Sequence, residues 1–408
     1  MKKPAALLFL LLSVSTLVAQ EKTDALRLYA DCAFCSQDYL RQHLPYLEYV
    51  RARQLADVHL IASQWPTAAR GQEVRYELIG QGRFAGLNDS LRFVLPLCAS
   101  ENEQNEKLAT ELETALIPFL ARTSYRKYLS FAYQPETKEK AIPSDPWKNW
   151  VFTVSASGRY RKEAAFRSSN LRSTVLLRKV TPEIRLQSYN YLGLNENLFQ
   201  TEDSQVRSIS RELYSSNVAI RSINDHWSYG GEVEFRASYF DNLKFQNRYW
   251  AALEYNLFPY AESSRRQLRF TPELGYDYRH YNDTTIYNQI REGFLAFDFQ
   301  IALALKEQWG EASTYIEVAS FLNEPTRYEL SLWAGLSLNL FKGLTLDINC
   351  DASLIRNQVG LPQSGLTKEE VLLQQRQQAT NFRLASSLGF SYTFGSIYND
   401  VVNPRFGY

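Results

Sequence analysis

The sequence predicts a mainly β fold, in which a transmembrane barrel of about twelve antiparallel strands follows a small N-terminal α/β domain. From Trp147 onward, apolar and polar residues alternate with period two, which is typical of strands with two different faces. Many alternating segments have roughly 12 to 16 residues, whereas strands of soluble domains usually have about 5 or 6. Aromatic residues recur near the segment ends, as the interface girdles of membrane barrels require: Trp147, Trp150, Trp227, Tyr249, Trp309 and Tyr328.

The first residues have the pattern of a signal peptide. Lys2 and Lys3 precede an apolar stretch at residues 5–18, and Ala19 stands where a signal peptidase would cut. An uncleaved anchor is the alternative interpretation. After residue 19 the sequence has no apolar run of the roughly 20 residues that a membrane helix needs. We therefore expect residues 1–19 to be removed and the chain to be exported.

The composition argues against nucleic-acid binding. The chain has 45 Lys and Arg against 44 Asp and Glu, a net charge of +1. This balance lacks the basic footprint that such proteins show.

Residues 20–133 are predicted to form a periplasmic α/β domain. Helical spacing of apolar residues covers residues 36–53, although Pro45 is expected to disturb it. Strands are predicted at 58–62, 74–80 and 91–97. Ser100 and Glu103 resemble a capping box. The helix that follows places these residues on one face: Leu108, Leu112, Ala115, Leu116 and Leu120. Residues 134–146, with three prolines among charges, are predicted to be a linker.

Residues 147–408 are predicted to form the barrel. In residues 327–341, for example, leucines on one face alternate with polar residues on the other. The predicted strands are 148–161, 168–180, 183–195, 206–223, 227–240, 243–257, 266–280, 290–306, 312–322, 327–341, 344–356 and 380–395. Long connections are expected at 196–205, 281–289 and 357–379. Because the connections do not alternate in length throughout, ten or fourteen strands remain alternatives.

Charged residues within these segments share the polar face. Charges that face lipid would cost about 2–4 kcal/mol near the midplane, so we expect them to face an enclosed lumen. There they line a conduit or pair with one another, and the mixed signs favour pairing. The predicted lumen residues are Glu232, Glu234, Arg236, Glu254, Arg269, Glu273, Asp277, Arg279, Asp298, Glu317, Glu329, Asp347 and Arg383.

The last predicted strand contains a candidate assembly signal. Gly389, Tyr392 and Phe394 fit the polar-x-Gly-x-x-aromatic-x-aromatic pattern of the signal that the outer-membrane barrel-assembly machinery reads. That signal normally ends a chain, whereas residues 395–408 follow it here.

Several motifs together resemble an uncharacterised family of Gram-negative outer-membrane β-barrel proteins with an N-terminal CxxC-containing periplasmic α/β domain. They are Asp31-Cys32-Ala33-Phe34-Cys35, Ala56-Asp57-Val58-His59, Asp225-His226-Trp227-Ser228, Glu254-Tyr255-Asn256-Leu257-Phe258-Pro259-Tyr260 and Val402-Asn403-Pro404-Arg405-Phe406. The resemblance covers both halves of the chain. It implies the architecture and brings no established activity.

Cys32 and Cys35 are the candidate redox pair. In an oxidising compartment a local disulfide is the favoured interpretation, and pairing with Cys98, a catalytic role and a metal site are the alternatives. A zinc site would need about two further ligands, and His43 and His59 are the local histidines. We expect no metal and no cofactor. Cys350 shares the apolar face of its strand.

The sequence favours two functions over an enzyme. His226 and His280 are the histidines of the barrel half, and no nucleophile motif accompanies them. The first hypothesis is a narrow, porin-like channel for small solutes in the outer membrane. The second is a closed scaffold whose periplasmic domain binds a protein or envelope partner. The expected partners are therefore outer-membrane lipid, the assembly machinery and a possible periplasmic protein.

Overall fold

The computed structural model describes residues 25–67, 69–97, 99–130, 145–200, 205–341, 344–365 and 377–392. The predicted signal peptide, nearly all of the predicted linker, Cys98, Phe394 and much of the predicted loop 357–379 lie outside these residues.

The N-terminal part contains a five-stranded mixed sheet in the order β2-β1-β3-β4-β5. Its strands are β1 (Leu26–Asp31), β2 (Leu47–Tyr49), β3 (Val58–Pro66), β4 (Gln72–Gly80) and β5 (Asn88–Leu95). β1 runs parallel to both β2 and β3, and the pairs β3–β4 and β4–β5 are antiparallel. The three predicted strands of this region are confirmed, whereas β1 and β2 were not predicted.

Helix α2 (Glu101–Leu120) covers one face of this sheet. It begins at the predicted capping box, in which the Ser100 and Glu103 side chains each bond to the other residue's backbone N–H. The apolar positions predicted for one face are buried, and Leu112 and Leu116 are fully so. They pack with side chains of β1, β3 and β4 in a single core. Across the described residues, no helix is both long and apolar enough to cross a membrane.

The predicted helix over residues 36–53 is wrong in extent. Helix α1 (Gln37–His43) starts after Ser36, whose side chain accepts from the backbone N–H of Tyr39. It ends before Leu44 because the residue before a proline is disfavoured in the α region and Pro45 has no N–H to donate. The rest of the segment forms β2 and the short 3-10 helix η1 (Arg53–Leu55).

A disulfide joins Cys32 and Cys35, which confirms the favoured interpretation of this motif. The pair connects the end of β1 to the start of α1, and both residues are buried. It therefore closes the turn between strand and helix within the core.

The C-terminal part is one antiparallel sheet of twelve strands, each hydrogen-bonded to its neighbours in sequence. The predicted strand count is thus confirmed. The strands are β6 (Trp150–Lys162), β7 (Phe166–Val180), β8 (Ile184–Gln200), β9 (Gln205–Ser222), β10 (Trp227–Ser238), β11 (Leu243–Asn256), β12 (Arg266–Tyr281), β13 (Arg291–Glu307), β14 (Gly310–Phe321), β15 (Glu324–Phe341), β16 (Leu344–Ile355) and β17 (Phe382–Tyr392).

The long connection predicted at residues 196–205 is wrong. β8 and β9 continue pairing as far as Gln200 and Gln205. The polar residues at 195–197 interrupt the apolar alternation, but backbone pairing does not require apolar side chains when the strands extend as a hairpin.

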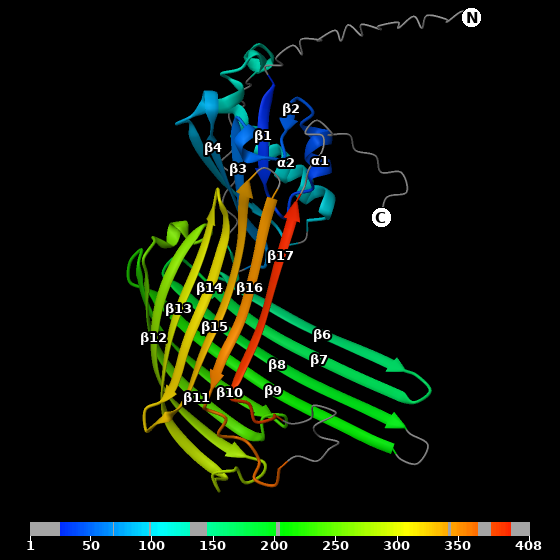
Figure 1. Cartoon of the computed structure of the whole chain (residues 1–408), viewed down its shortest axis with the longest axis vertical. Helices are drawn as coiled ribbons and strands as arrows, with labels where there is room; N and C mark the ends of the chain where they lie inside the picture. Colours follow the sequence, from blue (N-terminus) through cyan, green and yellow to red (C-terminus); the bar gives the residue numbers. More distant parts are fainter. Residues whose placement is uncertain are drawn as a thin grey trace, which may run out of the picture.

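The predicted closure of the sheet into a barrel is not seen. β6 and β17 are the two edges, and in the described residues neither is paired with the other. In Figure 1, β6 to β9 run at a steep angle to β14 to β17. Edge amides and carbonyls can bond to water, so only a hydrocarbon environment forces such a sheet to close.

The N-terminal domain lies at the end of the large sheet where the odd-numbered strands from β7 to β17 finish. In Figure 1 the arrowheads of β13, β15 and β17 point toward it. Arg53 donates to the carbonyl of Gln308, in the turn that follows β13. Arg75 and Arg92 both donate to the carbonyl of Ala261, in the 3-10 helix η4 (Tyr260–Glu262). We call this end of the large sheet the domain end and the opposite one the far end.

Candidate functional site

The large sheet has two chemically different faces. Residues opposite one another in a strand pair share a face, so the register assigns each side chain to one side. On the outer face, Leu274, Leu295 and Leu330 are between 42% and 50% exposed. All of the predicted lumen residues lie on the other side, which we call the interior face: Glu232, Glu234, Arg236, Glu254, Arg269, Glu273, Asp277, Arg279, Asp298, Glu317, Glu329, Asp347 and Arg383.

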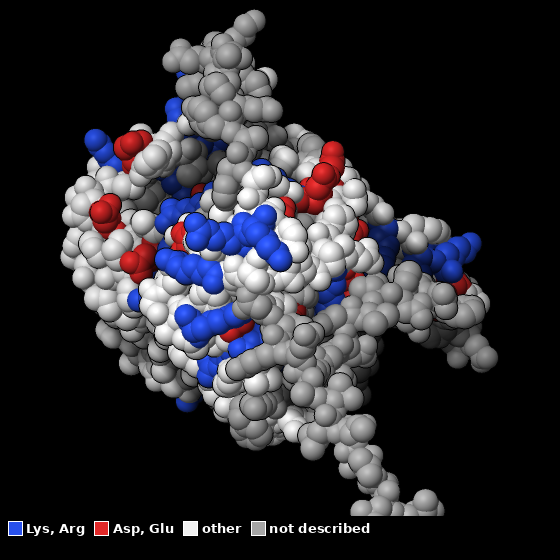
Figure 2. All heavy atoms as spheres, turned by 90° about the horizontal axis from the view of Figure 1, so that it is seen from above, with Lys and Arg blue, Asp and Glu red and all other residues white. Residues whose placement is uncertain are grey.

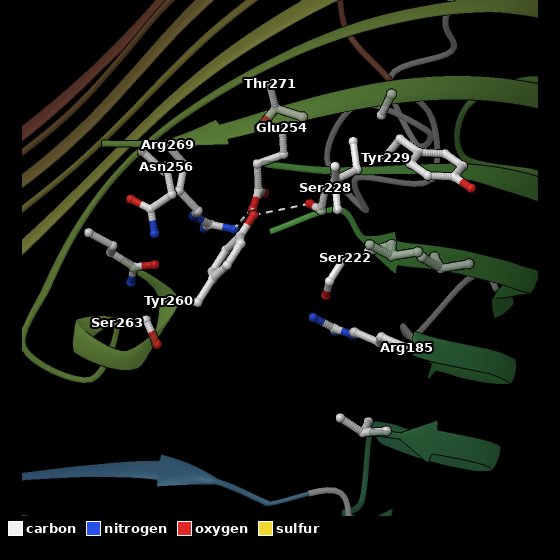
Figure 3. A pocket seen from close by; sticks show the side chains of 18 of the residues that line it. Arg185, Ser222, Ser228, Tyr229, Glu254, Asn256, Tyr260, Ser263, Arg269 and Thr271 are labelled. Carbon is white, nitrogen blue, oxygen red and sulfur yellow. Dashed lines mark hydrogen bonds and ion pairs between the residues drawn. The ribbon is translucent and has the colours of Figure 1, made fainter. Parts of the chain in front are cut away.

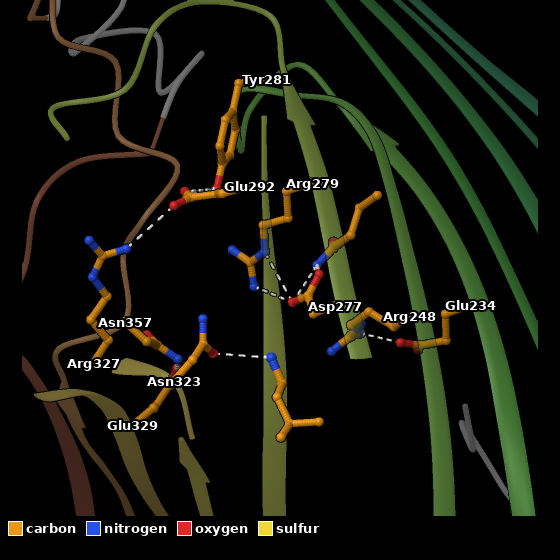
Figure 4. A network of polar contacts seen from close by, with 12 residues as sticks. Glu234, Arg248, Asp277, Arg279, Tyr281, Glu292, Asn323, Arg327, Glu329 and Asn357 are labelled. Atoms are coloured by element: carbon orange, nitrogen blue, oxygen red, sulfur yellow. Dashed lines mark hydrogen bonds and ion pairs between the residues drawn. The ribbon is translucent and has the colours of Figure 1, made fainter. Parts of the chain in front are cut away.

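Near the far end, the interior face carries a network of paired charges (Figure 4). Asp277 is almost fully buried and accepts from Arg279 at 2.7 Å and from Gln246 at 2.8 Å. Arg248 pairs with Glu234. The buried charges of this network thus have an opposite charge or a hydrogen-bond donor beside them, which offsets the cost of burying them.

An apolar cluster and a loop lie next to this network. Tyr281, Phe294, Phe321 and Val359 are buried against one another. Val359 belongs to the segment after β16, which reaches the connection between β12 and β13 through the bridge between Thr285 and Pro362. Asn357 donates to Glu329 at 3.0 Å, so side chains also fasten this segment to the interior face. The far end is therefore partly filled by protein.

A large cavity lies at the domain end, between the interior face and the N-terminal domain. Its volume is about 1110 Å³, and Trp65 and Glu73 of the domain contribute to its wall. Tyr260 projects into it from η4, donates to Glu254 at 2.9 Å and contacts the Ser228 hydroxyl at 3.1 Å (Figure 3). Arg269 pairs with the same carboxylate at 3.3 Å. This side of the cavity is thus held in place by a polar network.

Other charged groups in the cavity have no ion-pair partner among the residues that the structure describes. The guanidinium of Arg185 has a hydrogen bond to the neutral side chain of Gln187 at 3.4 Å. Glu232 accepts from the Ser216 hydroxyl. Among the described residues, Arg185, Glu232 and Glu273 have no opposite charge within ion-pair distance. These three side chains can bind a charged solute without first breaking an ion pair.

The domain is held at the cavity by charges as well. Glu77 of β4 is 7% exposed and bridges Arg75 to Arg265, which follows η4. Arg265 in turn pairs with Glu307 at the end of β13. The wall that the domain contributes is therefore attached to the sheet through a buried carboxylate.

Sequence reasoning missed Arg185, Tyr260 and the domain residues of the cavity. Arg185 has the same alternation signal as the predicted set, because it is two residues before Gln187 on the polar face of β8. Tyr260 is in a connection between strands, and Trp65 comes from another domain. No periodicity relates such residues, so their meeting depends on the tertiary structure.

The remaining predicted residues are placed as follows. Gly389 and Tyr392 are in β17, while Phe394 of the candidate assembly signal lies outside the described residues. Cys350 is a free thiol on the outer face of β16. In the described part of the chain, no group of His, Cys, Asp and Glu has the arrangement of a metal site.

Comparisons with protein-family models, with curated proteins and with solved structures found no match to this chain.

Proposed function

We propose that this chain is an integral β-barrel protein of a bacterial outer membrane and forms a narrow conduit for small polar solutes. The observation that carries the proposal is the division of β10 to β17, within one twelve-stranded sheet, into an apolar outer face and a charged interior face beside a large polar cavity. In a soluble protein an exposed apolar surface of this extent would be a liability. In a bilayer it is the surface that contacts lipid.

The strand lengths support a membrane location. The strands have between 11 and 18 residues, and a tilted strand needs roughly 9–11 to cross a bilayer. Exposed aromatic side chains occur at both ends of the outer face, for example Trp227 at the domain end and Tyr160 and Phe382 at the far end. In this proposal the sheet closes by pairing β6 with β17, the domain is periplasmic, and residues 1–19 are the export signal.

Closure is tested by crosslinking the two edge strands. In a background with Cys98→Ser and Cys350→Ser, Phe152→Cys in β6 is combined in turn with Leu388→Cys, Phe390→Cys and Tyr392→Cys in β17. All four positions are on the outer face of the edges. We expect one combination to crosslink in reconstituted membranes and migration on gels to be heat-modifiable. The matched control is Phe235→Cys in β10, which is combined with the same β17 positions and should not crosslink.

Conduction is tested on the same reconstituted protein in planar bilayers. We expect small, steady conductance steps, because the cavity is open to polar solutes while the far end is partly filled. A folded, crosslinkable barrel that remains electrically silent would contradict the conduit and leave the membrane location intact.

The second candidate is a closed scaffold whose periplasmic domain binds a partner. The paired charges and apolar cluster at the far end favour it, because they obstruct a path along the axis. So does the outer surface of the domain, where Figure 2 shows Lys and Arg gathered near the centre of the view. If the silent barrel instead yields a crosslinked envelope partner that is lost on removal of residues 25–130, this candidate replaces the conduit.

A further inference from the structure

The charges of the interior face are segregated between two walls. On β6, β7 and β8 the charged side chains of the interior face are all arginines: Arg159, Arg161, Arg172, Arg178 and Arg185. On β10 to β14 the same face carries a majority of carboxylates, among them Glu232, Glu254, Glu273, Asp298 and Glu317. An electric field therefore runs across the interior from one wall to the other.

The cavity at the domain end is bounded by both walls. Arg185 borders it on one side, and Glu232, Glu254 and Glu273 border it on the other. Glu254 is already neutralised by Arg269, whereas Arg185, Glu232 and Glu273 have no ion pair among the described residues. Among the described residues, Arg185 is thus the lining cation without an ion pair, and Glu232 and Glu273 are unpaired carboxylates on the facing wall. Glu73, Glu183 and Asp225 are further lining carboxylates without an ion pair among these residues.

We infer that this cavity binds zwitterionic solutes, specifically short unblocked peptides, with the carboxylate on Arg185 and the ammonium group between Glu232 and Glu273. An arginine fork matches a carboxylate in a bidentate geometry, and an ammonium group with three donors suits two carboxylates. The volume of about 1110 Å³ exceeds what a single amino acid fills and matches the upper range of ligand pockets.

The peptide backbone between the two charged ends also finds partners there. Ser222 and Thr271 border the cavity with hydroxyl groups (Figure 3). These groups donate to or accept from peptide amides without selecting a side chain. The arrangement therefore selects peptides by their length, which sets the distance between the two charged ends, and tolerates different side chains.

The inference rests on the proposed function for its biological meaning, but binding is measured without transport. Binding to the purified full chain in detergent is followed by calorimetry with four matched probes: triglycine, its N-acetyl form, its amide, and the doubly blocked form. We expect triglycine to bind best and the doubly blocked form to bind at least tenfold more weakly, because the blocked form lacks both charged groups and hydrogen bonds to charged groups are the strong ones.

Two variants assign the ends of the peptide. Arg185→Gln should weaken triglycine and the N-acetyl form about tenfold and leave the amide unchanged. Glu273→Gln should weaken triglycine and the amide and leave the N-acetyl form unchanged. The matched control is Arg221→Gln, at the same end of the sheet but on the outer face, which should alter none of them. Circular dichroism and heat-modifiable migration establish that each variant is folded.

The outcomes separate this inference from the conduit. Equal binding of all four probes, or no binding by a protein that conducts, overturns the peptide site and leaves the proposed function standing. Selective binding by a protein that is electrically silent supports the site and contradicts the conduit.

Discussion

Asp57 shows how a single side chain organises the edge of the N-terminal domain. It is 1% exposed, it accepts from the backbone and guanidinium of Arg27, and it pairs with Arg83 at 3.1 Å. Burial alone would raise the pKa of this carboxyl. The hydrogen bonds and charges of the two arginines outweigh burial and hold the pKa below its ordinary value. Two segments far apart in the sequence are thereby joined at one ionised group.

Asp57 is expected to make the stability of the domain depend on pH. A carboxyl whose pKa is lower in the folded state contributes stability that is fully present above its unfolded pKa of about 3.9. That contribution is lost as the pH falls through the folded pKa. Asp57→Asn should therefore destabilise the domain by about 2–3 kcal/mol at neutral pH. It should also weaken the loss of stability at acidic pH, as the free energy of unfolding in urea from pH 7 to pH 3 would measure.

Glu103→Gln serves as the comparison, because that carboxyl is at an exposed helix cap. At pH 7, Glu103→Gln should lower the free energy of unfolding by less than Asp57→Asn does. An Asp57→Asn variant that is as stable as the original chain at pH 7, and that loses stability in the same way as the pH falls, would refute this role.

At the scale of elements, local sequence signals predicted most boundaries and failed where a tertiary partner was needed. The capping box starts α2 because it satisfies backbone donors within four residues of sequence. β2 is three residues long and becomes a strand by pairing with β1. No local pattern marks so short a strand. The disulfide was only partly predictable. The Cys32-x-x-Cys35 motif is visible in the sequence, whereas β1, the strand that precedes it, was not predicted.

The disulfide between β1 and α1 is expected to stabilise the domain modestly. It closes a very short loop, so the chain-entropy relation gives about 2 kcal/mol. Cys32→Ser with Cys35→Ser should lower the midpoint of domain unfolding accordingly and leave heat-modifiable migration of the large sheet unchanged. Pulse proteolysis in urea would measure the first effect. A double variant that unfolds at the original urea concentration would contradict it.

At the scale of the whole molecule, the domain and the large sheet meet through charged side chains. Glu77 is the buried centre of that contact, between Arg75 and Arg265. Because the domain supplies Trp65 and Glu73 to the cavity wall, a change in docking alters the cavity itself. Docking and solute binding are therefore expected to be coupled.

Glu77→Gln is expected to loosen the domain from the sheet. The substitution leaves two arginines without their shared anion, which should raise the frequency of opening roughly tenfold or more, since a charged hydrogen bond contributes about 1.5–3 kcal/mol. Hydrogen exchange at η4 and the end of β13 should accelerate. Glu111→Gln, on the surface of α2 beside Lys107, is the control. Unchanged exchange at η4 in the Glu77 variant would show that the contact does not hold the domain.

The sequence by itself predicted about twelve strands, their antiparallel order and which side chains share a face, because period-two alternation and short turns are local properties. The exact number, for which ten and fourteen were alternatives, came from the structure. The sequence also identified the disulfide pair and the face of α2 that is buried. The open edges at β6 and β17, the loop against Phe294 and the cavity between Trp65 and Arg185 were decided by the tertiary structure alone. Each depends on where distant segments come together in space, and alternation along a strand carries no information about that.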